Sequence, residues 1–155
     1  MAKEIERKFL VCNDDWRQDR EGTLIRQGYL AMDDRMAIRV RVAGRKATLN
    51  IKSVQEDLVN RDEYEYPIPL EDAQAMLEHL CQRRLVEKRR YTFACEGMTW
   101  EVDEFAGANT GLVLAEIELD SADQAFTKPG WLGREVSHDP RFLNSNLSVH
   151  PYATW

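Results

Sequence analysis

The chain has 155 residues, of which 43% are hydrophobic and 31% are charged, and its formal net charge at pH 7 is −6. This length suits one domain with a buried core, and the acidic balance argues against a general nucleic-acid binder. Its three cysteines include no CxxC pair, which argues against a disulfide framework or a zinc site and favours reduced thiols in the cytoplasm. We find no secretory leader and no apolar stretch long enough to span a bilayer, so we expect no membrane partner.

We predict a single domain over residues 1–155, built mainly from β-strands. Period-two segments separated by turn residues predict eight strands, at 3–11, 23–31, 36–43, 46–53, 59–68, 86–95, 98–105 and 112–120. The connections "AGRK" and "CEGM" are short enough for hairpin turns, in which Gly44 and Gly97 can take positive φ. This rhythm favours an antiparallel meander.

One helix is predicted over residues 70–84, because its apolar residues fall on one stripe at Ala73, Met76, Leu77 and Leu80. We expect this helix to cover an outer face or an end of the sheet. Shorter helical turns are predicted at 121–126 and 131–134. The final stretch, 138–155, is expected to be irregular with one short helix.

Charges of like sign share one face of most of the predicted strands. Side chains two residues apart on a strand point the same way, as in the pairs Arg39 and Arg41 or Glu116 and Glu118. A half-exposed sheet would also alternate apolar and polar residues, and for any single strand that is the simpler interpretation. Like charges ~5–7 Å apart repel by roughly 2–3 kcal/mol at an effective dielectric constant of ~20, so strands sorted by sign suggest clusters that bind a ligand.

An eight-stranded sheet can close on itself, with an interior just wide enough for side chains or one small ligand. We therefore predict a mainly β (α+β) fold: an eight-stranded antiparallel closed β-barrel, or tunnel, with a few flanking helices. If the charged faces point inward, the interior must be a hydrated cavity, because buried charges need partners. Its expected cations are Lys8, Arg39, Arg41, Lys52, Lys88, Arg90 and Arg134, and its expected carboxylates are Glu4, Glu6, Glu63, Glu65, Glu101, Asp103, Glu116 and Glu118.

Both signs of charge together predict a polyanion bound with a metal ion. Arginine binds phosphate through a bidentate fork, and lysine adds a compact charge. Carboxylate clusters suit hard divalent ions such as Mg²⁺ or Mn²⁺, which bridge protein and phosphate oxygens. The expected partner is thus a small polyanion, a tri- or polyphosphate.

These motifs also resemble those of a known family. "EIERKFL" resembles the ExExK signature of the CYTH, or triphosphate tunnel metalloenzyme, superfamily. The segments "AIRVR", "DEYEYPI", "VEKRRYTF", "WEVDEFAG" and "LVLAEIEL" then follow in the order and spacing of that family. The single-domain form resembles small bacterial members, several of which are inorganic triphosphatases. The resemblance implies a metal-dependent phosphoanhydride hydrolase that uses one or two Mg²⁺ or Mn²⁺ ions.

The resemblance also implies a role for each matching residue. Metal ligands would be Glu4, Glu6, Glu116 and Glu118, with Asp103 in support or at a second metal. The catalytic triphosphate cradle would be Lys8, Arg39, Arg41, Lys52, Lys88 and Arg90. Glu63, Glu65 and Glu101 would orient these bases and waters. Arg134 stands where the family often has lysine and would contact substrate or close the tunnel, while Tyr29 is either a core tyrosine or a tunnel residue.

The hypothesis for the reaction is hydrolysis of the terminal phosphoanhydride of a linear triphosphate. One ion on Glu4, Glu6 and Glu118 would act as a Lewis acid, and either a second ion or a metal-bound water near Asp103 and Glu116 would supply the nucleophile. Alternatives within the fold are a class IV adenylate cyclase and a thiamine triphosphatase. A non-catalytic polyphosphate-binding barrel and an open sheet with a solvated charged face are the others, and a homodimer is left open.

Overall fold

A computed structural model describes residues 3–82 and 84–155. Most of the regular structure is β, and one helix of ten residues and one of six accompany it. The elements are β1 (Lys3–Val11), β2 (Thr23–Met32), β3 (Met36–Ala43), β4 (Lys46–Ser53), β5 (Asn60–Pro67), α1 (Leu70–His79), β6 (Leu85–Cys95), β7 (Met98–Phe105), β8 (Val113–Glu118), β9 (Leu132–Glu135) and α2 (Asn144–Val149).

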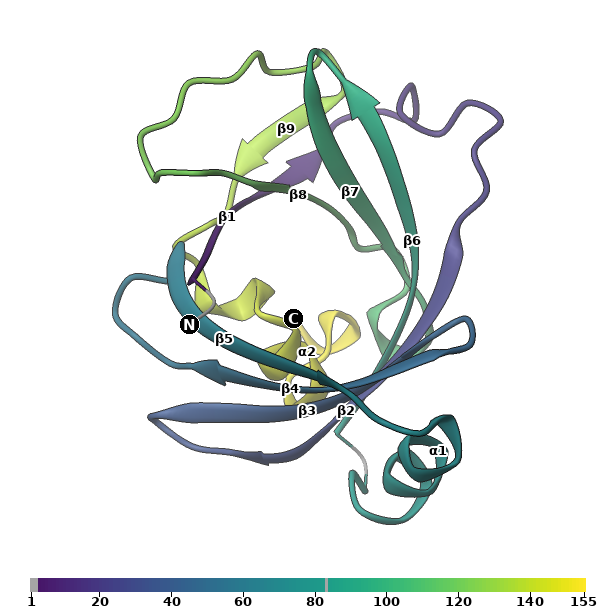
Figure 1. Cartoon of the computed structure of the whole chain (residues 1–155). Helices are drawn as coiled ribbons and strands as arrows, with labels where there is room; N and C mark the ends of the chain where they lie inside the picture. The colour runs from purple at the N-terminus through teal and green to yellow at the C-terminus, as the bar shows by residue number, and fades with distance from the viewer. Residues whose placement is uncertain (1–2, 83) are drawn as a thin grey trace.

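Eight of the strands form the predicted closed antiparallel barrel (Figure 1). Pairing runs in the order β5-β4-β3-β2-β6-β7-β8-β1, and β1 returns to β5 to close the ring. The closing seam is short, because it pairs only the first three residues of β1 with Asn60, Arg61 and Asp62. The later part of β1 pairs with β9 instead, through Phe9 and Val11. Gly44 and Gly97 take positive φ in their hairpin turns, as predicted.

Three local predictions were wrong. Residues 132–135 form β9 rather than a helical turn, because β1 beyond the seam offers an edge for pairing. Residues 121–126 form a bend and a turn rather than a helix. The predicted helix over 70–84 ends at His79, and Gln82 already has φ of 52°, which a helix cannot accommodate. Residue 83 lies outside the described residues.

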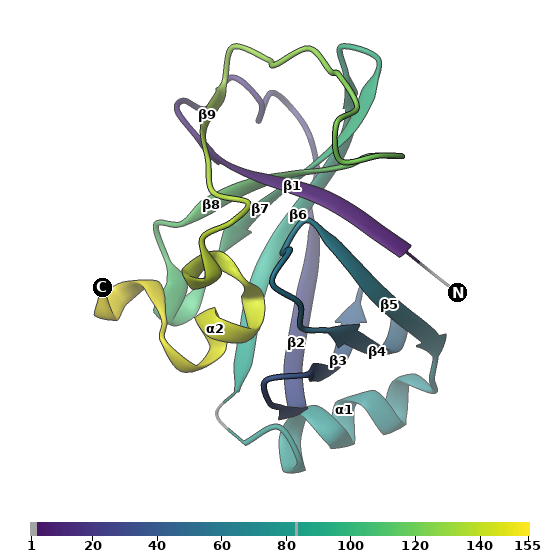
Figure 2. The ribbon, with the colours of Figure 1, turned by 90° about the vertical axis from the view of Figure 1, so that its left-hand side faces the viewer.

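Helix α1 covers the outer faces of β3 and β4, as Figure 2 shows below the barrel. Ala73 and Leu77 of the helix pack on Val40, which is fully buried. The chain after the helix comes close to β2 at Gly28, where an added Cβ would lie 2.7 Å from Sγ of Cys81. A side chain at position 28 would therefore push this segment away from the barrel. No helix among the described residues has the length and apolar character needed to cross a bilayer.

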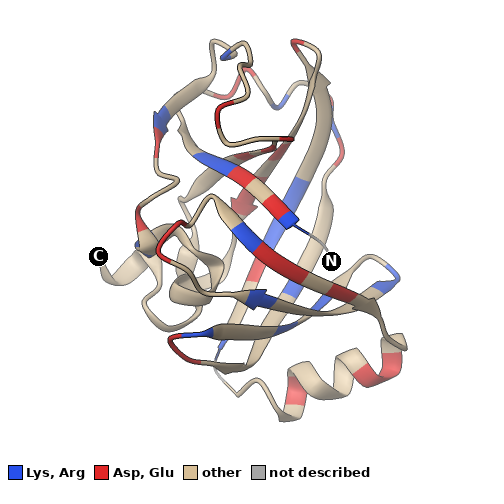
Figure 3. Cartoon of the chain, turned by 60° about the vertical axis from the view of Figure 1, so that its left-hand side comes forward, with Lys and Arg blue, Asp and Glu red and all other residues tan. Residues whose placement is uncertain are grey.

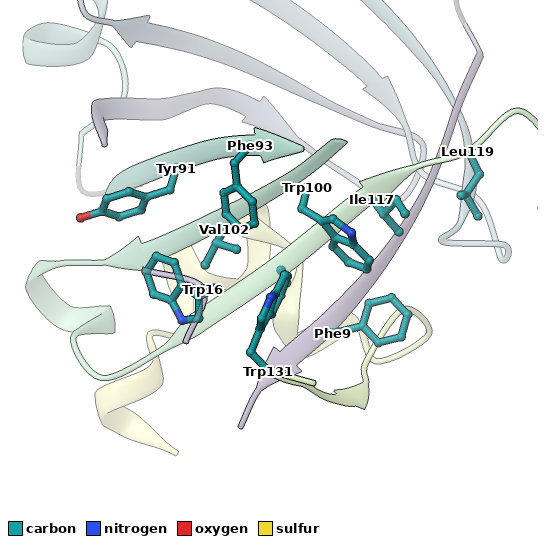
Figure 4. Close-up of a cluster of buried hydrophobic side chains, with 10 residues drawn as sticks. Phe9, Trp16, Tyr91, Phe93, Trp100, Val102, Ile117, Leu119 and Trp131 are labelled. Atoms are coloured by element: carbon teal, nitrogen blue, oxygen red, sulfur yellow. The ribbon is translucent and has the colours of Figure 1, made fainter. Parts of the chain in front are cut away.

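Aromatic residues coat the outer face of the other side of the barrel (Figure 4). Rings from the strands meet rings from the connecting loops, and Trp131 lies 5.4 Å from Trp100 and 5.8 Å from Phe93, centroid to centroid. These residues form the main core of the protein, which the edge-to-face contacts and the burial of apolar area stabilise. The core thus lies outside the barrel wall, and we call it the outer cluster: Phe9, Trp16, Tyr91, Phe93, Trp100, Val102, Ala115, Ile117, Leu119 and Trp131.

A second apolar group lies inside the barrel at one end. Leu10, Val86 and Leu114 each share a face with a charged cavity residue two positions away, and residues of the C-terminal segment pack against them. Helix α2 and the turn before it close this end of the barrel (Figures 1 and 2). This group, the apolar end, consists of Leu10, Val86, Phe105, Leu112, Leu114, Val136, Phe142 and Leu147.

Candidate functional site

The remaining interior of the barrel is a cavity of about 280 Å³. Charged residues of both signs lie along the strands (Figure 3), and many of them line this cavity. Its cations are Lys8, Arg39, Arg41, Lys52, Arg61, Lys88 and Arg90, and its carboxylates are Glu4, Glu6, Glu63, Glu65, Glu101, Glu116, Glu118 and Asp139. The ionic faces of the strands therefore point inward, and the open sheet with a solvated charged face is excluded.

Two residues expected in the cavity do not line it. Arg134 is exposed on β9, so its predicted place in the tunnel was wrong. Asp103 is fully buried beneath Lys88 and Arg90, which line the cavity in its place. Arg61 and Asp139 line the cavity although we did not predict them, and Arg61 was detectable because it lies two residues before Glu63 on the same strand face.

Asp103 supports two cavity cations from behind. Its carboxylate lies 2.7 Å from Nζ of Lys88 and accepts two hydrogen bonds from Arg90, at 2.7 and 2.8 Å. Burial opposes its charge, but Arg90 and Lys88 outweigh burial and hold the pKa of Asp103 well below its ordinary range. Both oxygens are already shared with cations, so the geometry does not support the expected metal-ligand role.

The same cluster sets the charge of the two bases. Burial, together with Arg90 and Arg41, lowers the pKa of Lys88 to about 7, against the opposing effect of Asp103. Burial also opposes the charge of Arg90, but Asp103 and the neighbouring glutamates raise its pKa further above the ordinary value. Arg90 additionally donates to Glu101 at 2.9 Å. At neutral pH, Lys88 is thus poised to gain or lose its proton, whereas Arg90 stays charged.

Glu4 and Glu63 meet at Lys52 on the opposite wall. Nζ of Lys52 donates to Glu4 at 2.8 Å and lies 4.0 Å from Glu63. Burial is outweighed by Lys52 and by a hydrogen bond with Glu63, so the pKa of Glu4 falls to about 2. Burial and that same hydrogen bond raise the pKa of Glu63 to about 6. On acidification the pair therefore takes up its first proton on Glu63 rather than on Glu4.

Glu6 lies among other carboxylates. It stands opposite Glu118 in the pairing of β1 with β8, and burial, Glu116 and Glu4 raise its pKa well above the ordinary value. Glu116 differs, because Lys8 at 3.9 Å and Arg90 at 3.7 Å overcome burial and lower its pKa to about 2. Glu6 therefore keeps its proton more readily than an ordinary glutamate, because Lys52 and Lys8 only partly offset a negative charge there, and a bound cation would supply the missing charge.

This carboxylate group has the right chemistry for a divalent ion. Hard ions such as Mg²⁺ take carboxylate oxygens and complete their shell with water and phosphate, so one or two protein carboxylates suffice. Among residues 3–82 and 84–155, no three carboxylate, imidazole or thiolate groups converge as a ready metal site. Glu4 forms an ion pair with Lys52, and Glu116 forms one with Arg90. Glu6 and Glu118 are therefore the pair most open to a metal ion.

Arg39 and Arg41 are the two cavity cations that β3 contributes. Nε of Arg39 is buried and lacks a hydrogen-bond partner. Burial, then Arg39 and Arg90, lower the pKa of Arg41 to about 10, so it is charged at neutral pH. Tyr29 is only 4% exposed and yet lines the cavity, so it belongs to both the core and the tunnel wall.

Several uncharged residues that we did not predict complete the site. Nδ2 of Asn50 donates to Glu63 and Glu65, and Nζ of Lys8 donates to the carbonyl of Phe142 at 3.1 Å. Gln27 and Asn144 contact cavity cations in a similar way. Neutral side chains carry no charge signal in the sequence, and the return of the C-terminal segment to the barrel is a tertiary feature, so neither was detectable.

Comparison with known proteins points in the same direction as this geometry. A model of the CYTH domain family matches residues 2–145. An inorganic triphosphatase of Acetivibrio thermocellus is 51% identical over 152 residues, covering 98% of this chain and 97% of that protein. One from Nitrosomonas europaea is 38% identical over 154 residues, covering 94% and 97%. The crystal structure of an inorganic triphosphatase, 36% identical, superposes with a TM-score of 0.70 over 96% of each chain.

Proposed function

Because the chain belongs to the CYTH domain family, we propose that it is an inorganic triphosphatase, which hydrolyses the terminal phosphoanhydride bond of tripolyphosphate inside its barrel. The products are orthophosphate and pyrophosphate. The attacking water forms the new P–O bond as the bridging P–O bond breaks.

The observation that carries this proposal is the ring of cations around the enclosed cavity. Its volume of about 280 Å³ lies near the lower end of the range for small-molecule pockets, which suits a linear inorganic anion. Arg39 and Arg41 both line the cavity, and the charge of their guanidinium groups is available to phosphate oxygens. Low local dielectric makes such preorganised charges stronger than they would be in water.

The carboxylates fit a divalent cation as the second requirement. The cavity has more carboxylates than cations, so a triphosphate needs additional positive charge to bind. We propose that Glu6 and Glu118, with Glu4 and Glu116 beside them, hold one or two Mg²⁺ or Mn²⁺ ions. When bound, the ion supplies Lewis-acid charge at the phosphate oxygens.

The chain's own residues then orient the substrate. Lys88 and Arg90, fixed by Asp103, face the cavity together and stabilise charge on the equatorial oxygens of the transferred phosphoryl group. Arg39 and Lys52 hold the remaining phosphates of the substrate from the opposite wall of the cavity. Glu101 keeps the guanidinium of Arg90 in place.

The test is phosphate release from tripolyphosphate, ATP and thiamine triphosphate, each with Mg²⁺, with Mn²⁺ and with EDTA. We expect metal-dependent turnover, fastest with tripolyphosphate. Cyclic AMP formed without phosphate release would identify a cyclase, and faster thiamine triphosphate hydrolysis would identify that activity. Tight binding of tripolyphosphate with no turnover under any metal would identify a non-catalytic barrel and reject the proposal.

Glu6→Ala is the sharpest variant for the metal role. Removing one of the two freest carboxylates should lower kcat/KM by about 10³-fold, or ~4 kcal/mol, and raise the Mg²⁺ concentration needed for half-maximal rate. Glu87→Ala is the matched control, because Glu87 is half-exposed on the outer face of β6. A near wild-type rate and metal requirement in Glu6→Ala would remove Glu6 from the ligand set.

We also propose a cytoplasmic location, a small polyanion as the only partner and no nucleic acid or membrane ligand. The three free cysteines, of which Cys12 is exposed, are compatible with a reducing compartment. A homodimer stays a prediction, which light scattering on the purified protein would test.

A further inference from the structure

A chain of two amides joins two cations of the cavity wall. Nε of Arg41 donates to Oε1 of Gln27 at 3.0 Å, and Nε2 of Gln27 donates to Oδ1 of Asn144 at 3.1 Å. The same oxygen of Asn144 accepts from Nζ of Lys88 at 2.9 Å. Gln27 has no exposed surface and lies just behind the residues that line the cavity. The chain links β3, β2, α2 and β6.

The cations at the two ends of this hydrogen-bonded series fix the orientation of each amide. Arginine and lysine can only donate, so each amide must turn its oxygen toward its cation. With Oε1 of Gln27 on Arg41, its Nε2 needs an acceptor, and Oδ1 of Asn144 supplies it. Gln27 stands directly opposite Arg41 in the pairing of β2 with β3, which keeps both side chains on the inward face. The backbone register therefore builds the contact.

Arg41 is held differently from its neighbour Arg90. Arg90 contacts the carboxylates of Asp103 and Glu101, which offset its charge. In the described part of the chain, Arg41 has no carboxylate within 4.0 Å, and the side-chain oxygen that accepts its hydrogen bond belongs to a neutral amide. A neutral acceptor fixes the guanidinium without cancelling its charge, which remains available to an anion.

We propose that Gln27 is a positioning residue for the triphosphate: it holds Arg41 in place without neutralising it and, through Asn144, ties it to Lys88. Neither amide is a catalytic residue, because both act through the cations. This inference rests on the proposed triphosphatase function. It explains why an uncharged, fully buried residue occupies the inward face of a strand beside a cavity lined with charges.

Gln27→Glu tests the neutrality of the acceptor. The variant keeps an oxygen for Arg41 and adds a negative charge next to it. We expect the KM for tripolyphosphate to rise by roughly tenfold or more, kcat to stay within about threefold, and the Tm to equal or exceed that of the wild type. Gln124→Glu is the control, because it makes the same chemical change in an outer loop.

Gln27→Met tests positioning. Methionine keeps the length of the side chain and removes both hydrogen bonds, so Arg41 loses its fixed orientation and kcat should fall by about tenfold. A purely structural role would instead lower the Tm in both Gln27 variants and leave the KM for tripolyphosphate unchanged. A KM of Gln27→Glu within twofold of both the wild type and Gln124→Glu would overturn the proposal.

Two further measurements keep the inference testable. If Gln27→Glu does not fold, Asn144→Asp adds the charge at the half-buried end of the chain, beside Lys88, and should raise the KM similarly; an unchanged KM would overturn the inference. If the wild type releases no phosphate, the proposed function fails. Calorimetric titration with tripolyphosphate then decides the inference by itself, since Gln27→Glu should still bind roughly tenfold more weakly, and equal affinity would overturn it.

Discussion

The ionic cavity and the apolar end occupy the same barrel interior and use the same strands. On β1, Lys8 faces the cavity and Leu10 the apolar end, and on β8 Glu116 and Leu114 divide in the same way. The apolar end stabilises the fold through buried area, whereas the ionic part costs desolvation energy that its ion pairs only partly recover. A step of two residues along one strand thus separates a part that maintains the fold from a part that binds.

Asp103→Asn should break the cavity most severely. The change leaves Lys88 and Arg90 buried without their shared counter-charge, so we expect a loss of about 3–5 kcal/mol in the free energy of unfolding. Urea denaturation measures it. A variant with wild-type stability and a raised Mg²⁺ requirement would instead return Asp103 to the metal-ligand set.

Leu147→Ala should damage the apolar end while sparing the cavity. Leu147 is 1% exposed, and the lost contacts and the resulting space should cost about 3 kcal/mol of stability. Val149→Ala on the same helix is the control, because Val149 is 41% exposed. We expect kcat of folded Leu147→Ala to lie within about twofold of the wild type. A large fall in kcat without a change in stability would show that the two parts are not separable.

Arg61→Ala should affect binding alone. Arg61 lines the cavity and its Nε donates to the carbonyl of Ser53, so its removal should raise the KM for tripolyphosphate by about tenfold, or ~1.4 kcal/mol. Arg134→Ala removes the same charge from an exposed site and should leave the KM unchanged. If the two variants behaved alike, the position of Arg61 in the cavity would have no bearing on binding.

The pH dependence of binding should reveal Lys88. Its pKa of about 7 is lowered chiefly by burial, so the ammonium is charged below pH 7 and loses its attraction for the anion above it. The KM for tripolyphosphate should rise by about three- to tenfold between pH 7 and pH 8. Lys88→Arg keeps the charge throughout this range and should flatten the profile. An equally steep rise in Lys88→Arg would assign the pH effect to another group.

The sequence predicted the barrel because apolar and charged residues alternate with a period of two along the strands of its wall. Seven of the eight strand predictions lie within one residue of the observed bounds at each end, and the last, 112–120, is longer than β8 (Val113–Glu118). The inward direction of the charges followed from the sorting of Arg39 with Arg41 and Glu116 with Glu118. The predicted family was confirmed by the match over residues 2–145.

What the sequence could not supply depends on contacts between distant segments. Edge pairing with β1 overrode the local preference of residues 131–134. Asp103 shares the inward face with Glu101, but Lys88 and Arg90 cover it. Strand alternation tells which face a residue occupies but not how far its side chain reaches. The amides Gln27 and Asn144 became visible only when the C-terminal segment was seen against the barrel.

The apolar end of the barrel has a consequence for how molecules enter and leave the cavity. Since Phe142, Leu147 and their neighbours occupy one exit, a molecule that enters the chamber has to leave by the way it came. On the proposed function, pyrophosphate must therefore depart before the next substrate arrives. On the same proposal, a longer polyphosphate would enter only by its terminus, because a passage closed at one end does not let it pass through.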